Sequence, residues 1–301
     1  MNQPWMAERE VPPELALALI REQFPALGAG GIQPFGSGWD NTAYLVDGAA
    51  VFRFPRKAST VALLERETRV MPHLAGRLPL AVPHPGWIGR PTERFPWMFA
   101  GYPRLAGITA CAADLRDEER MAAAAPLGAF LAALHAIPVD GLELPPDEIG
   151  RTAFARRMPE LEARLRHLRD RGHIAHDGPW LRLFDGGFPA PPPAPVVVHG
   201  DVYVRHLLVD DARRVSGVID WGDVHAGDPA VDLSVAYAFL PPHARGAFAR
   251  AYGPMDARTR RTARLRAAFH SAALAWFADD VGDAALLREG LTGLRHALED
   301  D

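Results

Sequence analysis

Two short apolar runs, each followed by an aspartate, constrain this sequence most. The first is Val196–Val198, which opens the stretch "VVVHGD" that ends at Asp201; the second is residues 215–219, which Asp220 follows. Short, β-branched runs bounded by turn-forming residues are typical of buried strands. A strand end carries polar groups to the rim of a scaffold, where chemistry is commonly placed. If the two strands pair as a hairpin, both aspartates and His206 meet at one end of a small sheet.

Composition bounds the class of protein. The chain has 301 residues, of which 48% are apolar, enough for one large domain or two lobes with separate cores. Its net charge of −4 does not suggest a basic footprint for nucleic acid, and a single cysteine, Cys111, excludes an internal disulfide or a cysteine-based zinc cluster. The start "MNQPWMAERE" lacks the features of a signal peptide, and no apolar run approaches the ~20 residues of a membrane span. We therefore expect a cytoplasmic protein without nucleic-acid or membrane partners.

Residue types shift along the chain. Glycine, proline and aromatic residues crowd positions 30–105, whereas alanine, arginine and leucine dominate after residue 112. This shift predicts a strand-rich first part and a helix-rich second part, which is an α+β fold. The stretch 96–105, "PWMFAGYPRL", reads as a buried strand that leaves toward a new region, and it is the candidate hinge.

The first part contains a helix, a hairpin and a glycine pair. Residues 12–25 have helical apolar spacing between prolines. The runs 42–46 and 49–54 flank Asp47-Gly48, the strongest short-range signal for a tight hairpin. Ahead of it, Gly36, Ser37 and Gly38 form a Gly-x-Gly, which is either an ordinary turn or a place where backbone approaches a phosphate.

Arg53 lies between two phenylalanines in the second strand of that hairpin. It either faces solvent on the outer side of the strand or faces a cleft as a phosphate-binding cation, and strand alternation allows both. The helix expected at 59–77, with Ser59 or Thr60 as its cap, carries Glu65 and Glu67. Either glutamate could simply be solvated, which is usual on a helix.

Helices dominate the second part. We predict a long alanine-rich helix over 118–136 with a kink at Pro126, and a charged helix over 151–171. A further helix starts at Asp228-Pro229 with Asp228 as N-cap, and residues 243–299 read as helices. Two strand-end carboxylates, a histidine, an upstream Gly-x-Gly and a strand cation together fit phosphoryl transfer.

These residues also carry a family resemblance. "HGDVYVRHLLVDD" and "GVIDWGDVHAGDPAVDLSVAYAFL" strongly resemble the aminoglycoside and macrolide phosphotransferases, and the order of elements agrees over roughly residues 30 to 255. The resemblance implies a bilobal protein-kinase-like α+β fold. Its N-terminal antiparallel-sheet lobe would be residues 1–101 and would bind nucleotide, and its larger, mostly helical C-terminal lobe would be residues 102–301.

The resemblance also assigns the strand-end residues. Asp201 would be the catalytic aspartate that contacts the substrate hydroxyl, and Asp220 the principal Mg²⁺ ligand. His206 stands where the aminoglycoside kinases usually have a metal-binding asparagine, and the macrolide kinases are similar in having histidine there. Because Mg²⁺ prefers oxygen, His206 is expected to ligate it weakly, to act through water, or only to hydrogen-bond Asp201.

Other matched positions complete the expected nucleotide site. Arg53 replaces the lysine that contacts the nucleotide phosphates, and Glu67, rather than Glu65, matches the glutamate that pairs with it. Arginine keeps the charge but is bulkier and forked, so its geometry must differ. Three successive hinge residues would give backbone hydrogen bonds to the purine: Phe99, Ala100 and Gly101. Asp228 and Asp232 resemble the acids that hold the loop after the metal aspartate.

The expected activity is transfer of the terminal phosphoryl group of ATP or GTP, with Mg²⁺, to a hydroxyl of an aminoglycoside- or macrolide-like antibiotic by a monomeric enzyme. A metabolic kinase of the same fold, acting on choline, homoserine, a sugar or a fructosamine, is the first alternative. A nucleotide-binding pseudokinase, with Arg53 and His206 as marks of decay, is the second. Acceptor specificity should lie in residues 140–190 and after 243, where acids such as Asp279 and Asp283 either serve a cationic aminoglycoside or only aid solubility.

Overall fold

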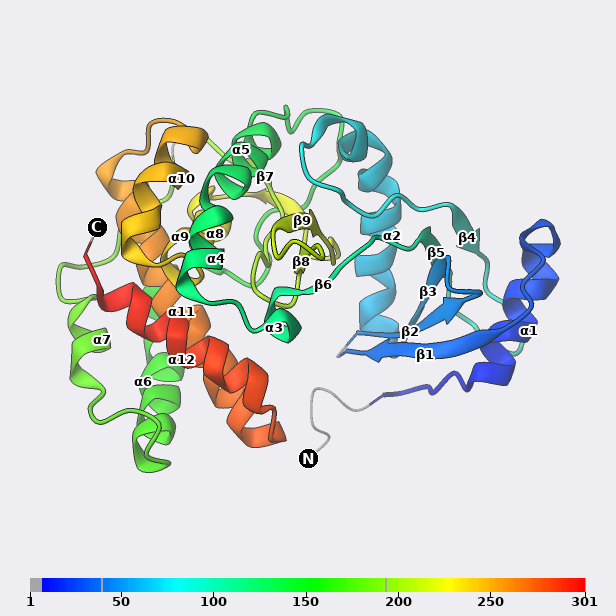
Figure 1. The fold of residues 1–301 in the computed structure, drawn as a ribbon, viewed down its shortest axis with the longest axis horizontal. Helices are drawn as coiled ribbons and strands as arrows, with labels where there is room; N and C mark the ends of the chain where they lie inside the picture. Colours follow the sequence, from blue (N-terminus) through cyan, green and yellow to red (C-terminus); the bar gives the residue numbers. More distant parts are fainter. Residues whose placement is uncertain (1–6, 39, 193, 301) are drawn as a thin grey trace. The chain divides into compact units, whose positions relative to one another are not determined.

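A computed structural model describes residues 7–38, 40–192 and 194–300, which form two compact units (Figure 1). The first unit comprises residues up to 76 together with 82–105 and 220–223, and the second comprises 77–81, 106–219 and 224 onward. Residues 77–81 thus belong to the second unit although the first unit flanks them in the sequence. Residues 220–223, which include Asp220, belong to the first unit although the second flanks them. The division into a nucleotide-binding lobe of residues 1–101 and a C-terminal lobe of residues 102–301 stays a prediction.

The first unit is an antiparallel sheet with one helix on each face. Its elements are α1 (Pro13–Gln23), the 3₁₀ turn η1 (Pro25–Leu27), β1 (Ile32–Ser37), β2 (Asn41–Val46), β3 (Ala50–Pro55), α2 (Ala58–Leu74), β4 (Trp87–Gly89) and β5 (Phe99–Pro103). The strand order is β1-β2-β3-β5-β4, so β5 is an interior strand although it comes last in the sequence. The five-stranded sheet and its helices confirm the strand-rich prediction for this part of the chain.

The predicted hairpin is confirmed, and its turn has an identifiable cause. Residues 47–49 connect the paired Val46 and Ala50, and the Ala49 N–H donates to the Val46 carbonyl at 3.0 Å. Asp47 and Gly48, at the centre of this tight turn, have left-handed φ of +48° and +71°. Asp47 adds a second function, because its carboxylate accepts the N–H groups of Gly30 and Gly31 at 2.9 and 2.7 Å. These two bonds lower the pKa of Asp47 and tie the start of β1 to the turn.

Alternation along β3 divides its side chains between the faces of the sheet. Phe52 and Phe54 pack with α1, and the Phe54 ring stacks on Phe99 of β5 with centroids 4.7 Å apart. Each fully buried ring of this kind contributes about 1.5–3 kcal/mol. Arg53 lies on the opposite face, where it pairs with Glu67 of α2. Its side chain is 16% exposed, so the solvated interpretation of Arg53 is wrong.

The second unit is mostly helical. Its elements are β6 (Ile108–Thr109), α3 (Ala110–Ala113), α4 (Asp117–Ala122), α5 (Ala124–His135), α6 (Phe154–Asp170), α7 (Gly178–Arg182), β7 (Val196–Val198), β8 (Leu207–Val209), β9 (Val215–Val218), β10 (His225–Gly227), α8 (Ala230–Leu233), α9 (Val235–Ala238), α10 (Arg245–Tyr252), α11 (Ala257–Val281) and α12 (Ala284–Leu298). The 3₁₀ turns η2 (Ala75–Arg77) and η3 (Pro242–Ala244) precede β4 and α10. The long helices α11 and α12 pack side by side (Figure 1).

The pairing of the two aspartate-tipped strands differs from the hairpin considered above. β7 pairs with β10, with Val198 opposite His225, whereas β9 pairs with β8, with Val218 opposite Leu207. The hairpin of β7 with β9 is therefore wrong. The sequence between β7 and β9 forms a strand of its own, β8. Because β8 is nearer to β9 in the sequence, it pairs with β9 in place of β7.

Three helix boundaries also correct the predictions. The helix expected over 118–136 is two helices that break at Ala123, and Pro126 lies in the first turn of α5, where a proline removes no needed donor. The N-cap of α2 is Lys57, not Ser59 or Thr60, and it makes no side-chain cap bond. Asp228 precedes the cap of α8, although its carboxylate still accepts the N–H of Ala230 at 3.0 Å.

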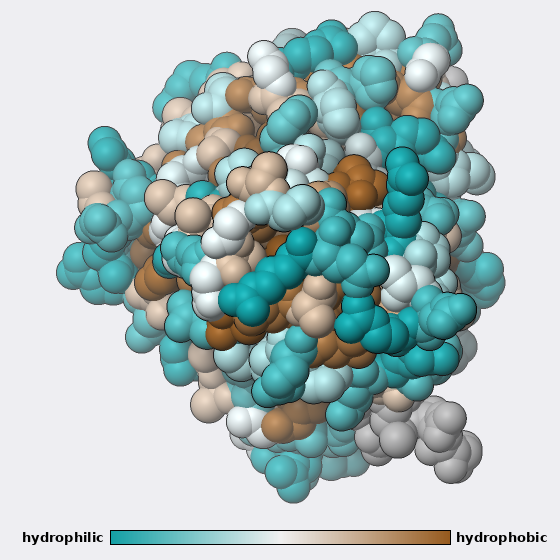
Figure 2. Space-filling view, turned by 90° about the vertical axis from the view of Figure 1, so that its right-hand side faces the viewer, coloured by the Kyte–Doolittle hydropathy of each residue, from teal (hydrophilic) through white to brown (hydrophobic). Residues whose placement is uncertain are grey.

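Hydrophilic side chains cover most of the face drawn in Figure 2, and hydrophobic ones show only in patches between them. No helix of the described residues is long and apolar enough to cross a bilayer.

We predict that Gly101→Ala destabilises the first unit. A Cβ at Gly101 would lie 2.5 Å from the ring of Phe52, which is fully buried and cannot move aside. Overpacking of this kind costs about 1–3 kcal/mol, measurable by urea denaturation. Gly86→Ala is the matched control, because a Cβ there would meet its nearest atom at an ordinary 3.7 Å. Equal stability of the two variants would contradict this account of Gly101.

Candidate active site

Arg53, Glu67 and Asp220 come together in the first unit. The Arg53 Nη1 donates to both carboxylate oxygens of Glu67 at 2.9 and 2.7 Å, and its Nη2 donates to Asp220 Oδ1 at 2.7 Å. Burial alone would lower the pKa of Arg53, but the two carboxylates raise it well above its ordinary value. The guanidinium is therefore a permanent cation, and its fork contacts two acids at once, which a single ammonium does less well.

Glu67 is the buried centre of this group. Its side chain is 0% exposed, and besides Arg53 its carboxylate accepts the backbone N–H of Trp221 at 3.1 Å. Buried carboxylates persist only where their oxygens are paired and hydrogen-bonded, as here. Glu67 thus ties α2, β3 and the segment 220–223 to one another. Glu65, the alternative glutamate on the helix, is exposed.

The backbone of Asp220 is strained. Its φ is +66°, in the left-handed region that a residue with a Cβ rarely adopts, at a cost of order 1 kcal/mol or more. Such strain persists only where the surroundings determine the conformation, and Arg53 on one side and the Trp221 bond on the other do so. The result is a half-exposed carboxylate held in one orientation.

Negative charge gathers around Asp220. Burial raises the pKa of Asp40, and the neighbouring charges of Asp220 and Asp223 raise it further, against Lys57 and Arg53. Carboxylates that repel one another in this way form a setting in which a divalent cation is favourable. Asp40 lies next to the predicted Gly-x-Gly, and nothing in its local sequence singled it out.

Gly36, Ser37 and Gly38 lie at the end of β1, close to the turn into β2. Gly36 pairs with Ala43, and the Gly38 N–H donates to the Asn41 carbonyl at 3.0 Å. A Cβ at Gly36 or Gly38 would meet no other atom within 4 Å, and neither has a positive φ. The protein's own packing therefore gives no reason for glycine here, whereas a ligand that approaches the backbone would.

The predicted hinge residues Phe99, Ala100 and Gly101 lie inside β5. This strand pairs with β4 along all three residues and with β3 at Ala100 and Gly101, and the Gly101 carbonyl also accepts the Gly86 N–H at 2.9 Å. Backbone groups that form a ladder on both sides are not available to a purine. Phe99 is paired on one side only, and the base contact expected at these three residues stays a prediction.

In the second unit, a buried acid fixes the turn that carries Asp201. The carboxylate of Asp232 accepts the N–H of His199 at 2.7 Å and the N–H of Gly200 at 2.9 Å, and His135 Nε2 lies 3.2 Å away. Burial would raise the pKa of Asp232, but these bonds, led by that from His135, hold it below its ordinary value. Asp232 therefore holds the turn before Asp201, and not the loop after Asp220 as the resemblance implied.

His199 links the turn to the neighbouring strand. Its Nε2 donates to the Ile219 carbonyl at 3.1 Å, and its Nδ1 accepts the Asp201 N–H at 3.2 Å. A neutral ring with its proton on Nε2 satisfies both bonds. The histidine of "VVVHGD" is therefore structural: it joins the backbone of Asp201 to the residue before Asp220.

His206 and His270 flank the Asp201 side chain. His206 Nδ1 donates to the Asp201 carbonyl at 2.8 Å and lies 3.5 Å from Oδ2, and His270 Nε2 lies 3.5 Å from Oδ1. Tyr203 packs edge-on against both imidazoles. Burial first, and then the charge of Arg266, lowers the pKa of His270 well below its ordinary value, so this ring is neutral at neutral pH.

Sequence reasoning missed His270 and Arg151. The Arg151 Nε donates to the Gly200 carbonyl at 2.9 Å, so this arginine braces the same turn. Both residues sit in segments with many similar arginines and histidines, and only the tertiary contact distinguishes them.

Comparison with known proteins decides the family. A family model described as "Phosphotransferase enzyme family" matches residues 31–286. The chain belongs to this family. Viomycin phosphotransferase of Streptomyces vinaceus is 37% identical over 103 residues, which are 33% of this chain and 36% of that protein. The chain thus matches about a third of the length of this curated member of the phosphotransferase family.

Solved structures agree on the fold. The GDP complex of wild-type aminoglycoside 2'-phosphotransferase-IIIa superposes with a TM-score of 0.67 at 22% identity, covering 96% of this chain and 99% of that one. A macrolide 2'-phosphotransferase from Brachybacterium faecium gives 0.61 at 23% identity, covering 94% and 97%. The predicted resemblance, the bilobal α+β fold and the phosphotransferase class of enzyme are confirmed.

We predict that Arg53→Met strongly destabilises the protein. The variant leaves Glu67 as a buried carboxylate without its cation, and the loss of one partner of such a pair costs about 3–5 kcal/mol. Urea denaturation measures the change in the free energy of unfolding. Arg53→Lys keeps the charge and should lose much less. If Arg53→Met unfolds within ~1 kcal/mol of wild type, the pair does not hold the sheet to α2.

Proposed function

We propose that this protein is a small-molecule kinase that transfers the terminal phosphoryl group of ATP or GTP to a hydroxyl of an antibiotic-like acceptor. The observation that carries the proposal is the Arg53–Glu67–Asp220 group: a fixed cation for phosphates beside a strained carboxylate for a metal. The names of the relatives support it, since they are phosphotransferases of viomycin, aminoglycosides and macrolides, one of them in complex with GDP.

The first unit would bind the nucleotide. The backbone at Gly36–Gly38 has room for phosphates, and Arg53 Nη2, now bonded to Asp220, would turn to a phosphate oxygen when nucleotide arrives. Nη1 would meanwhile keep its bonds to Glu67. The forked guanidinium would thus keep its structural contact while it exchanges the other one.

The residues fit Mg²⁺. Asp220 supplies hard oxygen, and the mutual repulsion of Asp40, Asp220 and Asp223 would fall with a cation present. His206 donates its Nδ1–H to the Asp201 carbonyl, so a bond from His206 to the metal would come from Nε2. No group of three or more ligating side chains gathers among the described residues, and Mg²⁺ characteristically takes one or two protein ligands with phosphates and water completing its shell. When bound, it would neutralise charge on the phosphates.

Asp201 would act on the acceptor. Its carboxylate would orient the hydroxyl and accept its proton, while the bonds from Asp232, Arg151 and His199 keep the turn fixed. His270, uncharged at neutral pH, would not compete for that proton. A screen of aminoglycosides, macrolides and metabolite alcohols with ATP and GTP tests the activity, and turnover of none of them would refute it.

Asp201→Asn should fold normally and lose most of its turnover. Asparagine has a similar shape but cannot accept the hydroxyl proton, and a positioned base contributes roughly 10²–10⁴ in rate. Nucleotide affinity, which we assign to the first unit, should be unchanged in an equilibrium titration. A variant that binds nucleotide poorly but turns over normally would reverse these roles.

Gly38→Ala should weaken nucleotide binding without affecting the fold. Because the new methyl meets no atom of the free protein, thermal stability should match wild type, whereas a bound phosphate would lose its close approach. We expect the nucleotide Kd to rise roughly tenfold, about one hydrogen bond to a charged group. Gly76→Ala, equally open and outside the proposed site, is the control. An unchanged Kd in Gly38→Ala would remove this segment from the nucleotide site.

A further inference from the structure

Arg266 is a buried cation beside Asp201. It lies on α11 one helical turn before His270, whose ring is 3.5 Å from the Asp201 carboxylate. Arg266 is 6% exposed, and its Nε is buried without a hydrogen-bond partner. Its guanidinium makes no hydrogen bond or ion pair with any residue in the described ranges. A charge left in this state costs several kcal/mol unless something pairs with it.

The other buried arginines of the described chain show how unusual this is. Arg120 pairs with Glu289 at 2.6 Å, and Arg151 pairs with Asp147 at 2.8 Å. Arg245 donates to three backbone carbonyls, those of Ala236, His296 and Glu299. Arg266 is buried to a similar degree without such contacts. The contacts of Arg120, Arg151 and Arg245 stabilise the fold and so explain why these residues are buried. No such contact explains the burial of Arg266.

Charges of both signs act on Arg266, but none of them forms an ion pair with it. Burial lowers the pKa of Arg266 to about 10. The charge of Asp201 opposes this shift most strongly, Arg151 and Arg157 add to it, and Asp147 opposes it. Even at that value the group stays charged at neutral pH.

The neighbouring helix α6 adds two more arginines. Arg157 and Arg164 both stack on the ring of Phe269, the residue before His270, and they share one carboxylate, Glu160. Each also keeps its Nη1 buried without a hydrogen-bond partner. The face of the second unit beside Asp201 is thus rich in guanidinium donors and short of acceptors.

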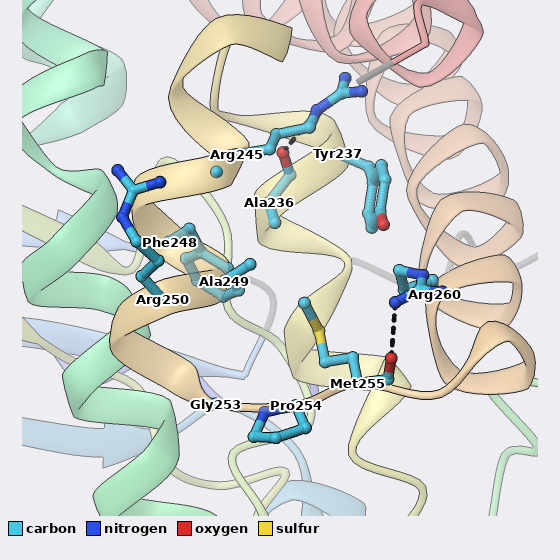
Figure 3. Close-up of a pocket in the computed structure, with 11 residues that line it drawn as sticks. Ala236, Tyr237, Arg245, Phe248, Ala249, Arg250, Gly253, Pro254, Met255 and Arg260 are labelled. Carbon is cyan, nitrogen blue, oxygen red and sulfur yellow. Dashed lines mark hydrogen bonds between the residues drawn. The ribbon is translucent and has the colours of Figure 1, made fainter.

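A more obvious hollow elsewhere in the second unit lacks these properties. The open pocket of about 660 Å³ drawn in Figure 3 lies among α9, α10 and the start of α11, and none of the proposed catalytic groups lines it. Its deepest cation, Arg245, is committed to Ala236 and other carbonyls, and Arg260 donates to the Met255 carbonyl at 2.6 Å. Arg250 also lines the pocket but is exposed to solvent, so the lining has no buried, unpaired cation comparable to Arg266.

We propose that the acceptor carries an anionic group, a carboxylate or a phosphate, that binds Arg266 while the acceptor hydroxyl is held at Asp201. This rests on the proposed kinase function and narrows it. An oxyanion would satisfy the orphaned guanidinium in a charge-assisted bond. A polycationic aminoglycoside would instead bring like charge to a face that already has too much of it, so acidic metabolites or acidic antibiotics are the expected substrates.

The test compares matched acceptors that differ in one charge. A hydroxy acid is compared with its amide, and a sugar phosphate with the parent sugar, using wild type, Arg266→Met and the control Arg260→Gln on the same helix. Wild type and Arg260→Gln should have a KM about tenfold or more lower for the charged member of the preferred pair. Arg266→Met should lose that preference. The two pairs separate carboxylate from phosphate as the anion.

The outcome that overturns the subsite is a wild-type enzyme that uses neutral or cationic acceptors as well as anionic ones, or a preference that survives in Arg266→Met. A binding measurement decides the matter independently of turnover. Inorganic phosphate and acetate, each added with saturating nucleotide, should raise the Tm of wild type and Arg260→Gln more than that of Arg266→Met. Equal shifts in Tm for all three proteins would refute the subsite, whether or not any acceptor is phosphorylated. Failure to phosphorylate any acceptor in the screen would refute only the kinase function.

Discussion

The buried carboxylate of Glu67 is the interaction on which the first unit depends. It takes the Arg53 guanidinium from β3 and the Trp221 N–H from the segment 220–223, and it leaves α2 fixed against the sheet. A carboxylate removed from water in this way must keep all of these partners, because losing any one exposes the full cost of burying the charge. The orientation of Asp220 follows from the same constraint, since Arg53 and Trp221 hold the residue from both sides.

The second unit solves the same problem in a different way. Asp232 is also fully buried, and it also uses its oxygens on backbone N–H groups, those of His199 and Gly200. In both units a buried acid holds the peptide groups next to a partly exposed acid that would do the chemistry. Backbone groups fixed in the folded state need no reorganisation when a ligand binds, which is how pre-organised sites lower a barrier.

The sequence predicted what local chemistry determines. Asp47-Gly48 demanded a hairpin, alternation placed Arg53 opposite its phenylalanines, and the "GDPAVDL" stretch carried the family. The sequence could not predict which strand pairs with β7, because a run of three residues is too short to show a periodicity that favours one neighbouring strand over another. Arg266 was invisible for a related reason. A helix rich in arginine looks uniformly solvated in sequence, and only the packing of α11 against α6 shows which of its charges are buried.

The two units carry unbalanced charges of opposite sign. In the first, carboxylates at Asp40, Asp220 and Asp223 raise one another's energy, and a cation relieves them. In the second, the Nε of Arg266 and the Nη1 atoms of Arg157 and Arg164 lack acceptors, and an anion would relieve them. An enzyme whose acceptor were a polycation would need the second arrangement inverted, with acids in place of Arg157, Arg164 and Arg266. On this proposal, the charge of the acceptor is selected by residues that would not touch the transferred phosphoryl group. Members of one fold family can differ at such positions without altering the chemistry they share.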